Sequence, residues 1–401
     1  MQLLWRRAGI LMSRIMESAN KPIAQTPPLG WNSWNTFGEK VDETVIRETA
    51  TAMVASGMKD AGYEYVVIDD CWSDKAGRDS NGDLVPHPDR FPNGIKALAD
   101  HVHSLGLKFG IYSDAANLTC AGWPGSYLNE EQDAALWAAW GVDFLKYDYC
   151  HAPSEQAVAI DRYTRMGNAL KGSGRQILFS LCDWGGRAPY LWGRKAGGHM
   201  WRVTGDVIDA WDNVSTSWGG LTINGAIDLG VYNAEYAGPG GWNDMDMLVV
   251  GIHGSGHTTE SGATDEEYRT QMAMWSILCS PLMAGCDIRR MDTATAETMM
   301  NPEILAVNQD PLGRQAVRVV QRGGLEVWRK PMSDGSIAAA FLNRTDGEAE
   351  IEVRWGELGL LDNVKLLVRD LWARQDVGEA REKLARTVPA HGTGMVRLSN
   401  G

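Results

Sequence analysis

Short apolar stretches alternate along the chain with longer segments in which apolar residues recur at helical spacing, from about Gly30 to Asp310. Parallel strands need such helical crossovers between them. Eight units of this kind predict a closed (β/α)8 barrel, a TIM barrel of the α/β class. The expected strands are 30–37, 63–70, 108–114, 142–149, 176–183, 199–206, 241–246 and 280–285.

The segments between these strands contain helix signals. Residues 41–62 have Asp42 as a candidate N-cap, and residues 154–174 end in glycine. The alternative is an open doubly wound sheet, but no G-x-G-x-x-G sequence follows the first strand, as a dinucleotide-binding fold requires.

After Asn308–Gly313 the pattern changes to short alternating stretches separated by turn residues such as Gly323-Gly324, Asp334-Gly335 and Asp346-Gly347. This pattern predicts an antiparallel β-sandwich domain. We expect an extension outside the core at 1–25, a catalytic barrel at 26–313 and the β domain at 314–401. Strands of the β domain are expected at 315–320, 325–330, 336–344, 350–355, 364–370 and 394–399.

Charge and composition narrow the classes of partner. The formal net charge of −13 disfavours binding to nucleic acid or to anionic membranes. Arg6, Arg7 and Arg14 interrupt the apolar residues of the N-terminus, so we expect no secretion signal and a cytoplasmic enzyme. The 17 tryptophans against 6 phenylalanines suit sugar rings, which stack on broad aromatic faces. The sequence is compatible with both a monomer and a homo-oligomer.

Polar and aromatic residues gather at the carboxyl ends of the expected strands, where barrel active sites are built. One acid at a strand end is explained by capping of the next helix, but seven strand ends together indicate a site. These residues are Trp31, Trp34, Asp69, Asp70, Tyr112, Asp114, Lys146, Asp148, Cys182, Asp183, Trp184, Arg202, Asp206, Asp244 and Asp246.

Two features that resemble metal sites favour other interpretations. His101 and His103 fall on an expected helix, where residues i and i+2 face apart. The sequence 79–83 has its glycine one position too early for a calcium loop, so we interpret it as a turn. We therefore expect no metal site.

Glycoside hydrolysis requires two carboxyls, one ionised and one protonated. Lys146 and Asp148 fall on the same face of their strand, so the ammonium favours an ionised, nucleophilic Asp148. Asp206 shares its loop with Ile208 and Trp211, and partial desolvation there is expected to raise its pKa, as a general acid needs. The sequence thus predicts Asp148 as nucleophile and Asp206 as acid/base.

The sequence resembles glycoside hydrolase family 27, the α-galactosidases of clan D, from Pro28 to Gly313. The resemblance lies in PPLGWNSWNTF, VVIDDCW, CAGWPGS, WGVDFLKYDYC, WRVTGD, GPGGWNDMDML and VNQDPLG, in that order. It implies a retaining hydrolase of terminal α-linked galactose without a cofactor. It also implies Asp148 and Asp206 as the catalytic pair, and as galactose contacts Trp34, Asp69, Asp70, Tyr112, Cys120, Lys146, Arg202 and Asp246.

The same resemblance bears on three further features. Residues matching Cys120 and Cys150 commonly form a disulfide in this family, although a cytoplasmic enzyme would favour free thiols. Asp183 stands where galactosidases often have Glu and relatives that cleave N-acetylgalactosamine have Ser, so we expect Asp183 at the 2-hydroxyl of galactose. Capping of the next helix, or pairing with Arg187, is the alternative. Met245 replaces a usual Pro, which is expected to loosen the loop of Asp246.

Other activities remain as alternatives. Within the family these are an α-N-acetylgalactosaminidase and a β-L-arabinopyranosidase. The second is disfavoured because Asp69 and Asp70 would then lack a hydroxymethyl group to bind. A catalytically inactive sugar-binding barrel is the alternative from another class, and it should lack one of the two catalytic acids.

Overall fold

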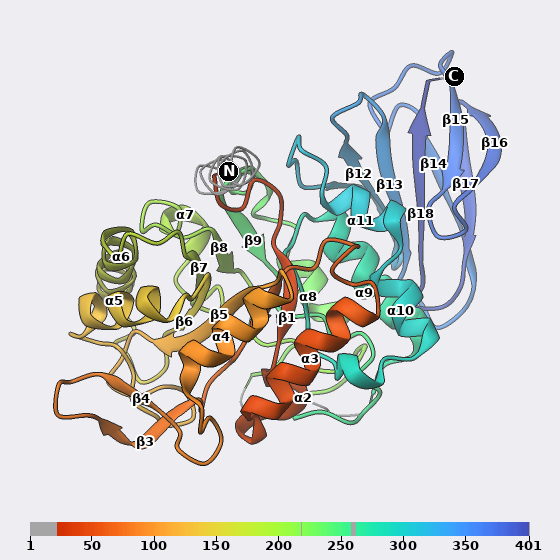
Figure 1. Ribbon diagram of the computed structural model, residues 1–401. Helices are drawn as coiled ribbons and strands as arrows, with labels where there is room; N and C mark the ends of the chain where they lie inside the picture. The colour runs from red at the N-terminus through yellow and green to blue at the C-terminus, as the bar shows by residue number, and fades with distance from the viewer. Residues whose placement is uncertain (1–21, 218, 258–261, 401) are drawn as a thin grey trace, which may run out of the picture.

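The computed structural model describes residues 22–217, 219–257 and 262–400 (Figure 1). Most of the expected extension therefore lies outside the described residues. Within these ranges, no helix combines the length and the apolar character needed to cross a membrane. The barrel and the β domain lie side by side, with the β domain in blue at the upper right of Figure 1.

Eight parallel strands form the barrel in the order β10-β1-β2-β5-β6-β7-β8-β9. The sheet closes beyond β9, where Leu248 forms a parallel bridge with Ala284 of β10. The fold class predicted from the sequence is confirmed. The strands are β1 Leu29–Asn32, β2 Tyr65–Val67, β5 Lys108–Asp114, β6 Phe144–Asp148, β7 Leu178–Cys182, β8 Met200–Arg202, β9 Trp242–Asp244 and β10 Leu282–Ala284.

Helices cover the outside of the barrel. Asp42 caps α3 as predicted, because its carboxylate accepts the backbone N–H of Val45 at 2.8 Å. The helices are α2 Trp34–Phe37, α3 Glu43–Ala55, α4 Gly94–Ser104, α5 Glu130–Trp140, α6 Gln156–Gly172, α7 Pro189–Trp192, α8 Ile223–Leu229, α9 Asp265–Ile277, α10 Thr293–Met299 and α11 Pro302–Asn308, with 3-10 turns η1 Gly38–Lys40, η2 Ala234–Tyr236 and η3 Ile288–Arg290.

The first strand is shorter than expected. The stretch 30–37 was predicted as one strand, but β1 ends at Asn32 and the chain turns into α2. The cause is local, since the side chain of Asn32 accepts the backbone N–H of Trp34 at 2.9 Å. The turn places Trp34 above the end of the strand, at the rim of the barrel.

A hairpin that the sequence did not predict projects beyond β2. Its strands are β3 Ser73–Arg78 and β4 Leu84–Pro86. The turn between them contains Asp79 and Asp83, whose backbones form a hydrogen bond, as the interpretation of 79–83 as a turn requires. Figure 1 shows the hairpin at the lower left of the barrel, in orange.

Apolar side chains fill the interior of the barrel at the end where the strands begin. Tyr65, Phe144, Leu178, Met200 and Trp242 form one apolar cluster there. Residues 22–25, expected outside the core, lie against this end: Ile23 and Ala24 contact the cluster, and Trp242 Nε1 donates to the carbonyl of Ala24 at 2.7 Å.

The β domain is one antiparallel sheet in the order β11-β12-β13-β18-β15-β16-β17-β14, curled around an apolar core that includes Phe341 and Trp355. Its strands are β11 Val317–Arg322, β12 Leu325–Pro331, β13 Ile337–Asn343, β14 Ala349–Arg354, β15 Lys365–Asp370, β16 Gln375–Arg381, β17 Lys383–Val388 and β18 Thr393–Ser399.

Two differences from the sequence prediction concern this domain. Strands β16 and β17 were not predicted. Six of the seven β16 residues are exposed, and in β17 the less exposed positions include Arg386, which breaks the apolar alternation. The turn at Asp346-Gly347 was expected to form a hairpin, but it joins β13 to β14, which pairs with β17 instead. Gly323-Gly324 does form the tight turn expected, between paired Arg322 and Leu325.

Candidate active site

The direction of each inner side chain follows from strand alternation. Phe144 of β6 belongs to the inner cluster, so Lys146 and Asp148, two and four residues later, also face inward. The strands pair in register, with Asp114, Asp148 and Cys182 at one level. The same parity turns Arg202 of β8 and Asp244 of β9 inward, because Met200 and Trp242 lie in the cluster.

These side chains surround a cavity at the carboxyl ends of the strands, with a volume of about 430 Å³. This volume falls in the range typical of small-molecule sites. The lining residues are Trp34, Asp69, Asp70, Tyr112, Cys120, Lys146, Asp148, Cys150, Trp184, Gly205, Asp206 and Gly219. Eight of the residues predicted as the catalytic pair or as galactose contacts, from five different strand ends, therefore meet in one cavity.

Asp148 is buried and held at both oxygens. Tyr112 donates its hydroxyl to Oδ2 at 3.0 Å, and the backbone N–H of Tyr149 donates to Oδ1 at 3.0 Å. Burial raises the pKa of Asp148 to about 7, against the opposing effect of the Lys146 ammonium. The sequence prediction gave that ammonium the larger effect; in the structure desolvation outweighs it.

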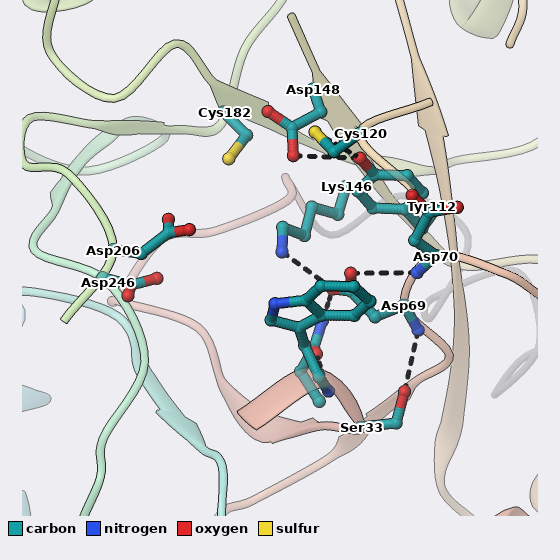
Figure 2. Close-up of polar contacts among 12 residues, drawn as sticks. Ser33, Asp69, Asp70, Tyr112, Cys120, Lys146, Asp148, Cys182, Asp206 and Asp246 are labelled. Carbon is teal, nitrogen blue, oxygen red and sulfur yellow. Dashed lines mark hydrogen bonds and ion pairs between the residues drawn. The ribbon is translucent and has the colours of Figure 1, made fainter. Parts of the chain in front are cut away.

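Lys146 pairs with a different carboxylate. Its Nζ lies 2.7 Å from Asp69 Oδ2, and both side chains are nearly buried. Asn32 Nδ2 donates to the same oxygen at 2.7 Å. Asp70 accepts backbone N–H groups from Cys71 at 2.6 Å and Ala121 at 2.9 Å. In Figure 2 Asp69 and Asp70 lie beneath Tyr112, and the side chain of Lys146, beside Tyr112, extends toward Asp69; Asp206 and Asp246 lie apart, at the left.

Arg202 holds Asp206 from behind, and neither Arg202 nor Asp246 is among the residues that line the cavity. This buried guanidinium lies 2.9 Å from Asp206 Oδ1 and 2.8 Å from Asp246 Oδ1. Asp246 also accepts the backbone N–H of Val207 at 2.7 Å, and burial raises its pKa to about 6. Asp246 thereby connects two strand ends and fixes the start of the loop that follows Asp206.

Asp206 is more open than Asp148. Its side chain is 37% exposed, whereas Asp148 is buried. Its negative charge is one of the causes of the raised pKa of Asp148. In Figure 2 the two side chains approach the cavity from different segments, Asp148 from the end of β6 and Asp206 from the loop after β8.

The disulfide candidates are bonded to each other. Cys120 and Cys150 form a disulfide with a Cα–Cα distance of 5.0 Å. Tyr112 donates its hydroxyl to Cys120 Sγ at 3.2 Å as well as to Asp148. Asp114 accepts the backbone N–H of Cys150 at 2.9 Å, so the bridge and the nucleophile's strand share one network.

One group of potential metal ligands occurs among the described residues. It comprises Asp114, Cys120, Asp148 and Cys150, whose ligand atoms lie within 4.8 Å of one another. Because its two sulfurs are bonded to each other, the group offers no thiolate to a metal.

Asp183 faces away from the cavity. It is fully buried, its Oδ1 lies 2.6 Å from Arg187 Nη1, and its Oδ2 accepts the backbone N–H of Arg187 at 2.9 Å. The expected contact with a sugar hydroxyl is therefore replaced by the alternative, pairing with Arg187. The reason is parity: Cys182 ends β7 facing inward, so the next residue points outward.

Cys182 and Trp184 lie at the site but were not among the predicted galactose contacts. Arg202 Nη1 lies 3.6 Å from Cys182 Sγ, and Trp184 lines the cavity. Trp184 has a φ of +50°, and the following Gly185 lies so close to the Val203 carbonyl that a Cβ would clash at 2.4 Å. Both residues had been noted at the rim, and strand alternation alone would have selected Cys182.

The expected looseness at Met245 is not found. Met245 is 1% exposed, and its backbone N–H donates to Ser280 Oγ at 3.0 Å, a bond that proline lacks. Asp246 follows with a φ of +77°, held by its contacts to Arg202 and Val207. Hydrogen bonding and packing therefore provide the rigidity that proline would have supplied.

Comparisons with known proteins agree with this geometry. A family model described as "Alpha galactosidase A" matches residues 26–310, and one described as "Alpha galactosidase C-terminal beta sandwich domain" matches residues 322–398. An α-galactosidase of Cyamopsis tetragonoloba is 44% identical over 95% of this chain and 88% of its own length. α-Galactosidase A of Cellvibrio japonicus is 42% identical over 97% of this chain and 96% of its own.

A solved structure extends the likeness to three dimensions. The crystal structure of α-galactosidase I from Mortierella vinacea superimposes with a TM-score of 0.89 at 36% identity, covering 96% of this chain and 99% of that one. Both domains and the cavity between the strand ends fall inside the matched length. This chain belongs to the α-galactosidase family, with a (β/α)8 barrel followed by the family's C-terminal β-sandwich domain.

Proposed function

We propose that this chain hydrolyses terminal α-linked galactose with retention of configuration, using Asp148 as nucleophile and Asp206 as acid/base. The observation that supports this most directly is that both carboxyls line one cavity together with the polar group of Asp69, Asp70 and Lys146. Retaining hydrolysis needs two carboxyls on either side of one anomeric carbon.

The proposed reaction has two displacements. Asp148 attacks the anomeric carbon while Asp206 gives its proton to the glycosidic oxygen, so the aglycone leaves and a galactosyl ester forms on Asp148. Asp206 then takes a proton from water, and the water oxygen displaces Asp148 from the anomeric carbon. The product is α-galactose, and both carboxyls return to their initial protonation states.

The protonation states support these roles. Burial and the negative charge of Asp206 both raise the pKa of Asp148, to about 7, so Asp148 can carry a proton near neutral pH before the substrate binds. We propose that the bound sugar covers the exposed face of Asp206 and moves that proton onto it, leaving Asp148 ionised. Tyr112 and the Tyr149 N–H then orient the two Asp148 oxygens for attack.

We propose that polar groups on two sides of the cavity bind different hydroxyls of the sugar. Asp69, Asp70 and Lys146 would bind the 4- and 6-hydroxyls, since carboxylates accept strongly from hydroxyls. Arg202 and Asp246 would hold the 2- and 3-hydroxyl side, with Cys182 and Trp184 limiting the space there. Trp34 and Cys120 would contact the ring.

The proposal also covers the domain boundaries, partners, cofactor and location of the enzyme. We propose catalytic and β-domain boundaries at 26–313 and 314–401, α-galactosides as the partners, no resident cofactor, and a cytoplasmic location. Binding to nucleic acid or membranes is disfavoured by the net charge of −13. Light scattering of the purified chain decides between a monomer and a homo-oligomer.

A substrate panel tests the assignment. Rates on nitrophenyl α-galactoside, α-N-acetylgalactosaminide and β-L-arabinopyranoside distinguish the three activities of the family, and we expect the α-galactoside to react fastest. Preference for either other substrate would contradict the proposal. Sugar binding by wild-type protein without turnover of any of the three would indicate the inactive barrel.

A further inference from the structure

Lys330 is a buried amine in an unusual setting. It lies on β12 with no solvent exposure. Its Nζ lies 2.7 Å from the carbonyl oxygen of Arg314 and 2.8 Å from Sγ of Cys279. No carboxylate among the described residues forms an ion pair with it, although buried lysines ordinarily have one.

The contact between nitrogen and sulfur is too short for a hydrogen bond. N–H···O bonds measure about 2.7–3.2 Å, and the larger radius of sulfur makes N–H···S contacts longer. Arg202 and Cys182 provide a comparison within this molecule, with a nitrogen–sulfur distance of 3.6 Å. The distance between Lys330 and Cys279 is also longer than a direct covalent S–N bond, so it fits two atoms joined through one small bridging atom.

We propose that Cys279 and Lys330 form a covalent cross-link in which one oxygen atom bridges sulfur and nitrogen, produced by molecular oxygen. The S–H bond and one N–H bond break, and S–O and O–N bonds form. Dioxygen loses its O–O bond: one oxygen atom enters the bridge and the other leaves as water with the two hydrogens. Sulfur and nitrogen together lose the four electrons that dioxygen gains.

The surroundings suit this chemistry. Cys279 is fully buried within the apolar cluster of the barrel, where it is near Met247, Met283 and Trp242. Dioxygen is small and apolar, so it enters such regions more readily than charged oxidants. The backbone of Cys279 has a φ of +55°, a left-handed conformation that is rare for a side chain of this kind, between the end of α9 and β10.

The cross-link would join the two domains. Cys279 belongs to the barrel and Lys330 to the β domain, 51 residues later. A covalent link of this separation restricts the unfolded chain in the same way as a disulfide. The thermal stability of the enzyme would then depend on oxygen exposure, while the active site remains unchanged.

Peptide mapping of the full chain tests the proposal. The enzyme is purified in air or under anaerobic conditions, denatured without reductant, alkylated with iodoacetamide and digested with trypsin. Residues 270–289 form one tryptic peptide that contains Cys279 and also Cys286, so each digest includes its own control cysteine. In the aerobic sample we expect Cys286 alkylated, Cys279 unmodified, and this peptide linked to the one containing Lys330 with a gain of about 14 Da.

Variants and reductant complete the test. Cys279→Ser and Lys330→Arg should abolish the linked peptide and the difference in melting temperature between aerobic and anaerobic samples, whereas Cys286→Ser should keep both. Tris(carboxyethyl)phosphine should release the link. Full alkylation of Cys279 in the oxygen-exposed wild type would overturn the proposal, and so would a link with a loss of about 2 Da, which indicates a direct S–N bond. This wild-type result does not depend on whether a variant folds.

Discussion

The replacement Asp183→Ser separates stability from substrate choice. In the structure the carboxylate of Asp183 pairs with the side chain and the backbone N–H of Arg187, and it does not reach the cavity. Serine would keep an acceptor for the backbone N–H but would lose the ion pair. We therefore expect a less stable enzyme with an unchanged preference for galactose over N-acetylgalactosamine.

The magnitude follows from the environment of Arg187. Removing one partner of a buried ion pair costs about 3–5 kcal/mol. Arg187 is 16% exposed, stacks over the Tyr149 ring with its guanidinium carbon 4.4 Å from the ring centroid, and donates to the Ser154 carbonyl at 3.1 Å. These remaining contacts reduce the loss, so we expect the free energy of unfolding to fall by about 2–3 kcal/mol.

Two measurements check this expectation. Urea unfolding followed by tryptophan fluorescence reports the stability, and kcat/KM on nitrophenyl α-galactoside and α-N-acetylgalactosaminide reports the preference. Trp184→Ala is the matched comparison, because Trp184 lines the cavity; it should shift the ratio of the two kcat/KM values by about 1–3 kcal/mol. A tenfold change in that ratio for Asp183→Ser, with unchanged stability, would refute the reasoning.

Further predictions concern the catalytic groups. Asp148→Ala and Asp206→Ala should each give a folded, nearly inactive enzyme, and azide should restore turnover only to Asp148→Ala; activity of that variant within tenfold of wild type would exclude Asp148 as nucleophile. NMR of the first product should show α-galactose, and a liganded structure should place the two carboxyls about 5–5.5 Å apart; initial β-galactose would exclude double displacement. The nucleophile must be ionised, and burial raises the pKa of Asp148 to about 7, so kcat/KM should fall as the pH decreases through that value. Lys146→Met should move this acidic limb of the pH profile to higher pH, because the ammonium favours the ionised carboxylate. An acidic limb at the wild-type pH would show that Lys146 does not control the charge of Asp148. Since Asp148 binds its proton more tightly in the folded state, Asp148→Asn should be more stable than wild type at pH 8, and this advantage should vanish toward pH 4; a constant difference would contradict the raised pKa.

Local signals in the sequence were sufficient for the barrel and for the catalytic pair. All eight expected parallel strands occur, because buried strands are continuous apolar stretches and their order along the chain fixes the sheet. Strand alternation correctly placed Lys146 and Asp148 on one face. Strand β16 was missed because nearly all of its residues are exposed, and β17 was missed because Arg386 takes one of its less exposed positions and breaks the apolar alternation.

The partners of each charged group were decided by the tertiary structure. The sequence indicates that Lys146 and Asp148 share a strand face, but not that Asp69, 77 residues earlier, takes the ammonium at 2.7 Å. It likewise cannot show that Ser280 accepts the Met245 N–H at 3.0 Å, which replaces the rigidity of proline. Such pairings join strands that are distant in the chain and adjacent only after the barrel closes.

The sequence by itself determined which residues reach the rim of the barrel, since position along a strand follows from local pattern. Only the folded chain decided which partner each rim residue meets: Cys182 and Asp183 are neighbours in sequence, yet Cys182 lies 3.6 Å from Arg202 and Asp183 pairs with Arg187. The physical reason is that strand alternation is local, whereas a partner on another strand comes near only when the barrel closes, and burial, charge and pKa all depend on such partners.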